Sequence, residues 1–215
     1  MFIDTKDPNY DKLIKMTEEE YDEYMCKTYP ILFRERNLPM SETCMCWGFN
    51  ISKGWYWILD HACAKLQAIG DKTGIWAIFG QIKEKFGTAR FYHDADINNS
   101  TIVNTQEQKL WKCIINDIVN DAEIATVHTC ADCGKDHYHE KIRIGGWVYD
   151  VCEKCLLKAR PEMKKGVEKN NRLNNIIHTI GANISYFTDD ELKTLEELNE
   201  KIAKRMENQH VPVCH

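Results

Sequence analysis

Two Cys-x-x-Cys pairs constrain this chain more than any other feature of its sequence. Cys130 and Cys133 form the first pair, Cys152 and Cys155 form the second, and 18 residues separate the two pairs. This spacing is typical of a four-cysteine zinc site. A gap of two residues lets both thiolates of a pair reach one tetrahedral ion, and four sulfur ligands leave no open position for water. The spacing therefore predicts a structural zinc site at these four residues.

A redox dithiol is the main alternative for such pairs. A thioredoxin-like pair stands alone beside a βαβ pattern, whereas these pairs flank a hairpin signal at Gly145-Gly146. Gly134 directly follows the first pair, which suits a tight knuckle, and the second pair begins a predicted helix (VCEKCLLKAR). Knuckle, hairpin and two ligands at a helix start together predict a treble-clef-like zinc module.

Histidines raise the question of catalysis. His137 and His139 lie between the cysteine pairs, but an HNH nuclease needs a further Asn and His on the following helix, which VCEKCLLKAR lacks. A zinc deaminase needs His-x-Glu and Pro-Cys-x-x-Cys, and neither occurs. His93 with Asp94 and Asp96 is a weaker candidate, because DADINNS has the composition of a solvated turn. An enzyme that uses these residues is therefore the third interpretation.

The remainder of the chain predicts an α+β fold. Thr17 and Glu20 have the spacing of a capping box, as do Thr188 and Glu191 before the last helix. Apolar periodicity and glycine stops predict further helices over 55–69, 75–86 and 105–125, with a strand over 88–93 and a polar turn after it.

These elements group into three predicted regions. The expectation is a mostly helical main domain with a short sheet (1–127), the zinc module (128–160) and a helical tail (161–215). The tail contributes a C-terminal helical pair, and a homodimer through these helices is an open possibility for its association.

Trp55, Trp76 and Trp111 fit apolar helix faces and are assigned to the core. Trp57 lies off the stripe formed by its neighbours and is expected at the surface.

The charge distribution bears on nucleic-acid binding. The chain carries 28 basic and 33 acidic side chains, a net charge of −5, which argues against coating nucleic acid through a basic surface field. The segment 128–172 is the basic exception, with ten basic and seven acidic residues. Its candidate phosphate contacts are Lys154, Lys158, Arg160, Lys164 and Lys165. A solvated helix face with interleaved glutamates explains the same run equally well. Trp147, on the predicted hairpin, is the best aromatic candidate for contact with a partner.

Cysteine usage indicates the compartment. Ten cysteines without a basic-then-apolar start at the N-terminus predict reduced thiols and a cytoplasmic location. No apolar run approaches the roughly 20 residues that cross a bilayer, so no membrane association is expected. Burial as free thiols is expected for the six cysteines outside the pairs, Cys26, Cys44, Cys46, Cys63, Cys113 and Cys214.

Three segments carry a resemblance to known proteins. CWGFNISKGWYWILDHACAKL (46–66), QIKEKFGTARFYHD (81–94) and CADCG…GGWVYDVCEKC (130–155) resemble a group of uncharacterised small bacteriophage proteins. Those proteins have a Gly-Trp-led helix, an Ile-Lys-Glu-Lys-Phe-Gly segment before a strand, and a closing zinc knuckle. The chain departs from them at Ala89, where a larger apolar residue is expected, and residues 156–215 fall outside the match. The resemblance implies a phage origin and a zinc module, and it carries no catalytic residue across.

A phage origin favours a function without an active site. Small phage accessory proteins often bind a host protein or block a component of host defence. The leading expectation is therefore a non-enzymatic, zinc-stabilised accessory protein that binds a host macromolecule in the host cytoplasm, with a host protein as the partner and counter-defence as the role. The alternative is nucleic-acid binding through the basic zinc module.

Overall fold

The computed structural model describes residues 9–135, 142–144 and 147–208. The chain divides into two compact units, residues 1–170 and residues 171–215. Among the described residues there are seven α-helices, a three-stranded sheet and a two-stranded sheet, which confirms the α+β class. The domain boundaries expected at 127/128 and 160/161 stay predictions. None of the described helices combines the length and apolarity needed to cross a bilayer.

The first unit begins with two short helices. They are α1 (Tyr10–Leu13) and α2 (Glu18–Thr28). The predicted capping box is confirmed, because the Thr17 side chain accepts from the backbone N–H of Glu20 at 3.2 Å and the Glu20 carboxylate accepts from the N–H of Thr17 at 2.9 Å. A loop that includes the short 3-10 helix η1 (Met45–Trp47) then leads to β1 (Phe49–Asn50).

The central sheet has the order β1-β2-β3. β1 runs parallel to β2 (Trp76–Lys85), and β2 pairs antiparallel with β3 (Thr88–Asp96). Phe86 and Gly87 both have positive φ angles, 54° and 74°, as the two central residues of a type I′ hairpin turn do.

The helix expected over 75–86 is wrong, since this segment is β2. Ile75–Phe79 is a short apolar run that is buried on both faces of the strand. Periodicity cannot distinguish such a run from a buried helix. The predicted turn after the next strand is also partly wrong, because Asp94 and Asp96 lie on β3, which extends further than expected.

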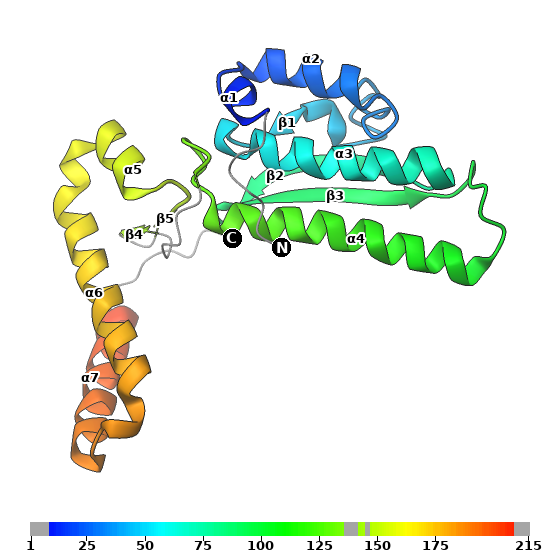
Figure 1. Ribbon diagram of the computed structural model, residues 1–215. Coiled ribbons are helices and arrows are strands. Elements are labelled where there is room, and N and C mark those ends of the chain that lie inside the picture. Colours follow the sequence, from blue (N-terminus) through cyan, green and yellow to red (C-terminus); the bar gives the residue numbers. More distant parts are fainter. Residues whose placement is uncertain (1–8, 136–141, 145–146, 209–215) are drawn as a thin grey trace. The chain divides into compact units, whose positions relative to one another are not determined.

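Two long helices, α3 and α4, pack against this hairpin (Figure 1). α3 spans Tyr56–Thr73, after the 3-10 turn η2 (Lys53–Trp55), and α4 spans Thr105–His128. α4 runs along β3 and closes its free edge: the N–H of Ala89 donates to Thr126 Oγ1 at 3.0 Å, and the N–H of Phe91 donates to Glu123 Oε1 at 2.7 Å. These two bonds occupy edge N–H groups in the first half of β3, which makes this part of the edge a poorer template for another strand.

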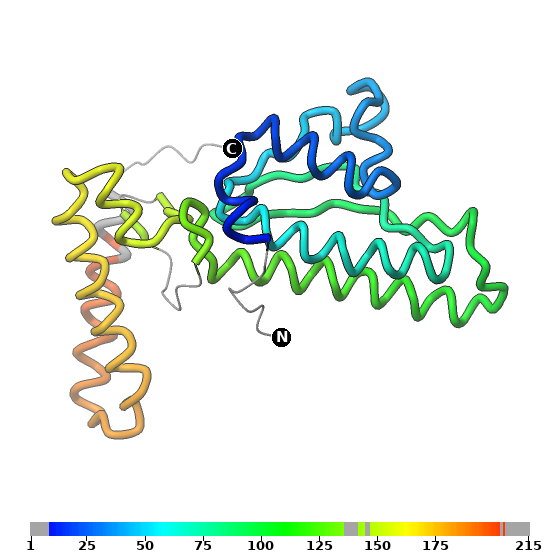
Figure 2. Tube along the Cα trace, turned by 45° about the horizontal axis from the view of Figure 1, so that its top comes forward, coloured from blue at the N-terminus to red at the C-terminus, as the bar shows by residue number. Residues whose placement is uncertain are grey.

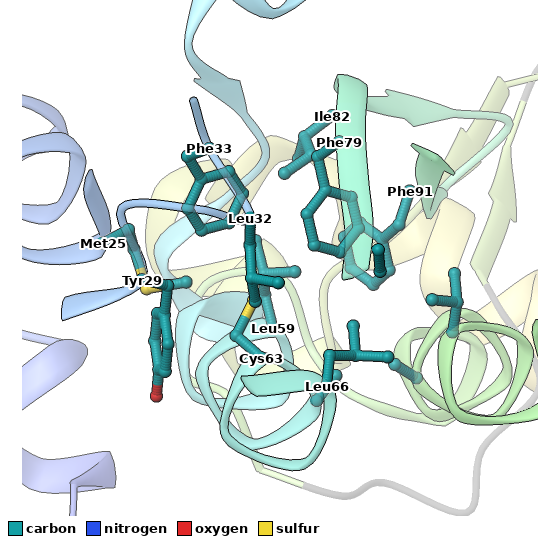
Figure 3. Packing of buried hydrophobic residues seen from close by; sticks show 14 of the residues in the cluster. Met25, Tyr29, Leu32, Phe33, Leu59, Cys63, Leu66, Phe79, Ile82 and Phe91 are labelled. Carbon is teal, nitrogen blue, oxygen red and sulfur yellow. The ribbon is translucent and has the colours of Figure 1, made fainter. Parts of the chain in front are cut away.

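The core of the first unit lies between α3, the hairpin and the segment after α2 (Figure 3). Phe33 stacks on Phe79 with ring centroids 5.2 Å apart. Cys63 lies within this core, as expected of a buried free thiol. The same expectation is wrong for Cys44 and Cys113, which are exposed, while Cys214 lies outside the described residues.

The chain continues from α4 into the cysteine-rich segment and then a helical tail. β4 (Ile142–Ile144) and β5 (Trp147–Tyr149) form the expected antiparallel pair, although its Gly-Gly turn lies outside the described residues. α5 (Glu153–Ala159) and the 3-10 turn η3 (Pro161–Met163) follow. α6 (Lys164–Asn183), η4 (Ile184–Tyr186) and α7 (Asp189–Asn208) complete the described chain. The trace in Figure 2 follows these elements from α5 to α7.

Candidate metal centre

The four paired cysteines lie together. The Sγ atoms of Cys130, Cys133, Cys152 and Cys155 are all within 4.8 Å of one another, and those of Cys133 and Cys152 are 4.0 Å apart. A tetrahedral zinc ion with bonds of about 2.3 Å separates its sulfur ligands by about 3.8 Å. The four thiols therefore fit one tetrahedral ion after small adjustments. Within the described residues they are the sole group of three or more metal-ligating side chains that converge in this way.

Local backbone geometry forms the first half of the site. Gly134 has a φ of +63°, and its N–H donates to the carbonyl of Cys130 at 2.9 Å, which closes a tight knuckle. The N–H of Cys133 points at Cys130 Sγ at 3.4 Å. A residue with a Cβ is disfavoured at positive φ, so the glycine expected at this knuckle has a conformational reason.

The second half of the site comes from the start of α5. Cys152 is the N-cap of α5, and Cys155 lies in its first turn. The N–H of Cys152 donates to Cys130 Sγ at 3.2 Å, which joins the two pairs directly. The N–H of Ala131 donates to the carbonyl of Asp150 at 2.9 Å, so the knuckle and the strand before α5 are also hydrogen-bonded.

The thiols differ in acidity. Burial raises the pKa of Cys130, but hydrogen bonds from the backbone N–H groups of Cys133, Cys152 and Asp132 outweigh burial and hold that pKa below its ordinary value. Burial raises the pKa of Cys133 to about 11 against a hydrogen bond from Lys135, and the neighbouring Cys130 adds to the rise. Burial and then Cys152 raise the pKa of Cys155 well above its usual range. Cys133 and Cys155 would therefore give up their protons only to a bound cation that balances the charge of the thiolates.

The main domain holds the knuckle through two tryptophans. The indole Nε1 of Trp55 donates to the carbonyl of Thr129 at 2.9 Å, and that of Trp57 donates to the carbonyl of Gly134 at 3.2 Å. Both rings are almost fully buried. Trp57 was expected at the surface, and that expectation is wrong because the knuckle covers it.

Backbone contact reinforces these two bonds. The N–H of Gly54 donates to the carbonyl of Ala131 at 2.8 Å, and a Cβ at Gly54 would lie 2.3 Å from the carbonyl oxygen of Cys130. Tyr10 Oη donates to the carbonyl of Cys133. Lys53 and Asp132 form an ion pair at 3.3 Å, and both side chains are about half exposed. The start of α3 and the knuckle therefore form one packed contact, which the cysteine spacing alone did not predict.

Among the weaker catalytic candidates, the three that the structure describes, His93, Asp94 and Asp96, do not gather into a site. His93 and Asp94 are neighbours on β3, so their side chains point to opposite faces of the sheet. The ring of His93 contacts Asn116 Oδ1 at 3.1 Å and the carbonyl of Phe91 at 3.3 Å, while Asp96 pairs with Arg34 at 2.7 Å. His137 and His139 lie outside the described residues.

Asp60, on α3, has a structural role. Its buried carboxylate accepts from Tyr24 Oη at 3.0 Å, from Tyr29 Oη at 2.9 Å and from Asn9 Nδ2 at 3.1 Å. Burial and then the Asp60 charge raise the pKa of Tyr29 far above its usual range. These bonds fasten the N-terminal segment to α3.

Basic and aromatic side chains are exposed near the four cysteines, together with Glu153 and Glu162. Trp147, on β5, is 75% exposed. The five basic candidates Lys154, Lys158, Arg160, Lys164 and Lys165 are all exposed, on α5, at its end and at the start of α6. The Arg160 guanidinium lies 5.9 Å from the ring centroid of Tyr149, so one of the five has an aromatic partner within the module.

Comparisons with protein families, with curated proteins and with solved structures found no match to this chain.

Proposed function

We propose that Cys130, Cys133, Cys152 and Cys155 bind one zinc ion in a structural role. Thiolates are the ligands that tetrahedral zinc prefers, although iron accepts the same four-sulfur set. The metal would hold the knuckle, the β4–β5 pair and the start of α5 together as a treble clef. The spacing of the four Sγ atoms supports this role, and so do the bonds from Trp55 and Trp57, which tie the knuckle to the core.

The proposed function is binding and not catalysis. Four protein ligands saturate a tetrahedral ion, so the site would offer no position at which water or substrate is activated. The exposed Trp147 carries this proposal, because a large aromatic side chain at the surface of a metal-fixed hairpin suits partner contact. A host protein as the partner and counter-defence as the role follow from the resemblance to phage proteins.

A pull-down from host lysate tests this proposal with a matched pair of variants. Trp147→Ala removes the exposed ring beside the metal centre, whereas Trp47→Ala removes an equally exposed ring, at 68%, on η1. The proposal predicts that the parent and Trp47→Ala retain one specific protein and that Trp147→Ala loses it. Equal capture by both variants, or no specific partner for the parent, would contradict the proposal.

Nucleic-acid binding is the second candidate, favoured by the exposure of the five basic residues near the metal centre. Phosphate contacts release counterions, so binding of this kind weakens steeply as salt rises. A gel shift across a salt series compares Lys164→Glu/Lys165→Glu with Lys27→Glu/Lys109→Glu, which alters exposed lysines on α2 and α4. This candidate predicts salt-dependent binding that the first variant abolishes and the second retains. Binding independent of salt, or absent in the parent, would eliminate it.

A further inference from the structure

The second unit has no closed core among the residues whose burial the structure describes. None of residues 171–202 is buried, although the segment is rich in large aliphatic side chains. α6 and α7 run side by side in Figures 1 and 2. Six large aliphatic residues of this unit are 45–57% exposed: Leu173, Ile176, Ile177, Ile184, Leu198 and Ile202. Monomeric proteins seldom leave so many apolar side chains grouped at the surface.

The spacing of these residues shows why two helices are too few. Leu173, Ile176, Ile177 and Ile180 recur at three and four residues, which makes an apolar stripe wider than one neighbouring helix covers. Ile180 is half-buried, as are Phe187, Leu192 and Leu195 along the hairpin, while the residues beside them stay exposed. A stripe of this width is typical of a bundle of more than two helices.

We propose that this exposed face packs against the same face of a second copy of the chain, forming an antiparallel four-helix bundle. The charge along α7 identifies a second copy as the partner. Residues 189–200 carry six acidic and one basic side chain, whereas residues 201–207 carry three basic and one acidic. An antiparallel pair of α7 helices places the acidic half of each against the basic half of the other, and a two-fold axis does this twice.

The available area is sufficient for such a dimer. At about 1.5 Å per residue and about 10 Å per helix, the hairpin presents a face of about 500 Å². Two copies would bury about 1,000 Å² in total, which reaches the lower limit of specific interfaces. The inference is independent of the metal centre and of the proposed function, since it uses residues of the second unit alone.

Sedimentation equilibrium of the full chain over a concentration series tests the dimer without any variant. The proposal predicts a monomer–dimer equilibrium, and a monomer at every concentration would overturn it.

Ile177→Glu places a charge on the face, whereas Asn175→Glu places the same charge on an exposed polar position two residues away. The first variant should weaken association by at least about tenfold. The second should leave it unchanged, with circular dichroism showing that both stay helical. Equal association by the two variants would also overturn the proposal.

A charge exchange identifies the partner as a second copy in the antiparallel orientation. Lys201→Glu/Lys204→Glu makes α7 acidic along its length, and Glu196→Lys/Glu197→Lys makes its centre basic. Each variant alone should associate more weakly than the parent, because like charges then oppose each other across the two-fold axis. An equimolar mixture should recover the association as a heterodimer. A mixture that associates no better than either variant alone would contradict the antiparallel pairing.

Discussion

Residues 9–170 and residues 171–208 both form well-defined helices, yet they differ in what their helices cover. In the first unit, α3 and α4 share a hairpin sheet, and the four-cysteine site is bonded to the start of α3. In the second unit, residues 171–183 of α6 run beside α7, and none of residues 171–202 is buried. The sequence therefore forms helices in both units, but a closed core requires something further for two helices to pack against. The first unit has a sheet and four converging cysteines that could hold a metal ion, and we propose that the second unit uses another chain.

The largest expected effect is loss of the metal centre. Cys152→Ser removes a ligand and should lower the free energy of unfolding of the first unit by on the order of 5 kcal/mol, because structural zinc binding contributes to folding. Thermal unfolding, monitored by tryptophan fluorescence, measures this loss of stability, since Trp55 and Trp57 lie against the knuckle. Cys113→Ser, at an exposed cysteine of α4, is the matched control and should have no effect. An unchanged melting curve for Cys152→Ser would remove the metal centre from the account of the first unit.

The second effect concerns the contact between the knuckle and η2. Gly54→Ala should destabilise the first unit by about 3 kcal/mol, because the new Cβ would lie 2.3 Å from a backbone oxygen that cannot move aside cheaply. Urea unfolding of the parent and the variant gives this difference. A variant as stable as the parent would show that the knuckle is not packed on η2.

Acid should act on the first unit through Asp96. A hydrogen bond from the backbone N–H of Asn98, and then the Arg34 guanidinium, hold the pKa of Asp96 below its ordinary value. A lowered pKa in the folded state means that the stabilisation is present above the unfolded pKa, near about 3.9, and is lost as pH falls through the folded pKa. Asp96→Asn should therefore lower the free energy of unfolding by about 1 kcal/mol at neutral pH and leave it unchanged at low pH. The effect is small because Arg34 is half exposed, so solvent screens the ion pair. Chemical unfolding at several pH values measures it, and a gap between parent and variant that stays constant with pH would refute the assignment.

The smallest expected effect is that of a glycine-to-alanine substitution in the second unit, and its sign is opposite to that of Gly54→Ala in the first. Gly181→Ala lies on α6, and apart from the neighbouring backbone of α6 itself no described atom lies within 4 Å of the new Cβ. Alanine has the higher helix propensity, so the change should stabilise the second unit by about 0.5 kcal/mol. Circular dichroism through thermal unfolding measures it. At a concentration at which the chain is monomeric, a destabilisation comparable to that of Gly54→Ala would mean that α6 is tightly packed at this glycine within one chain, against the description of an open hairpin.

The sequence predicted the parts of this molecule that depend on local chemistry. Thr17 and Glu20 form their capping box three residues apart, and the bonds between Thr188 and Glu191 confirm the second box. The cysteine spacing predicted which four thiols converge, because a knuckle and a helix N-terminus each place two ligands with little help from the rest of the fold.

The parts that depend on distant segments were not predictable in the same way. The run Ile75–Phe79 suits a buried helix and a buried strand equally, and only its pairing with β3 decides between them. Trp57 breaks the apolar stripe of α3 because its partner is the knuckle, 77 residues further along the chain. One feature of the sequence could have indicated this contact. Gly54 comes immediately before Trp55-Tyr56-Trp57, and a glycine beside large aromatic residues marks a place where another backbone segment approaches closely.

Metal analysis of the purified protein tests whether Cys130, Cys133, Cys152 and Cys155 hold one zinc ion. Elemental mass spectrometry of the full chain, together with native mass spectrometry, gives the identity and number of bound metal ions. We expect one zinc ion per chain in the parent and in Cys113→Ser, and none in Cys152→Ser. A folded parent that contains no metal, or that contains iron at these four cysteines, would contradict it.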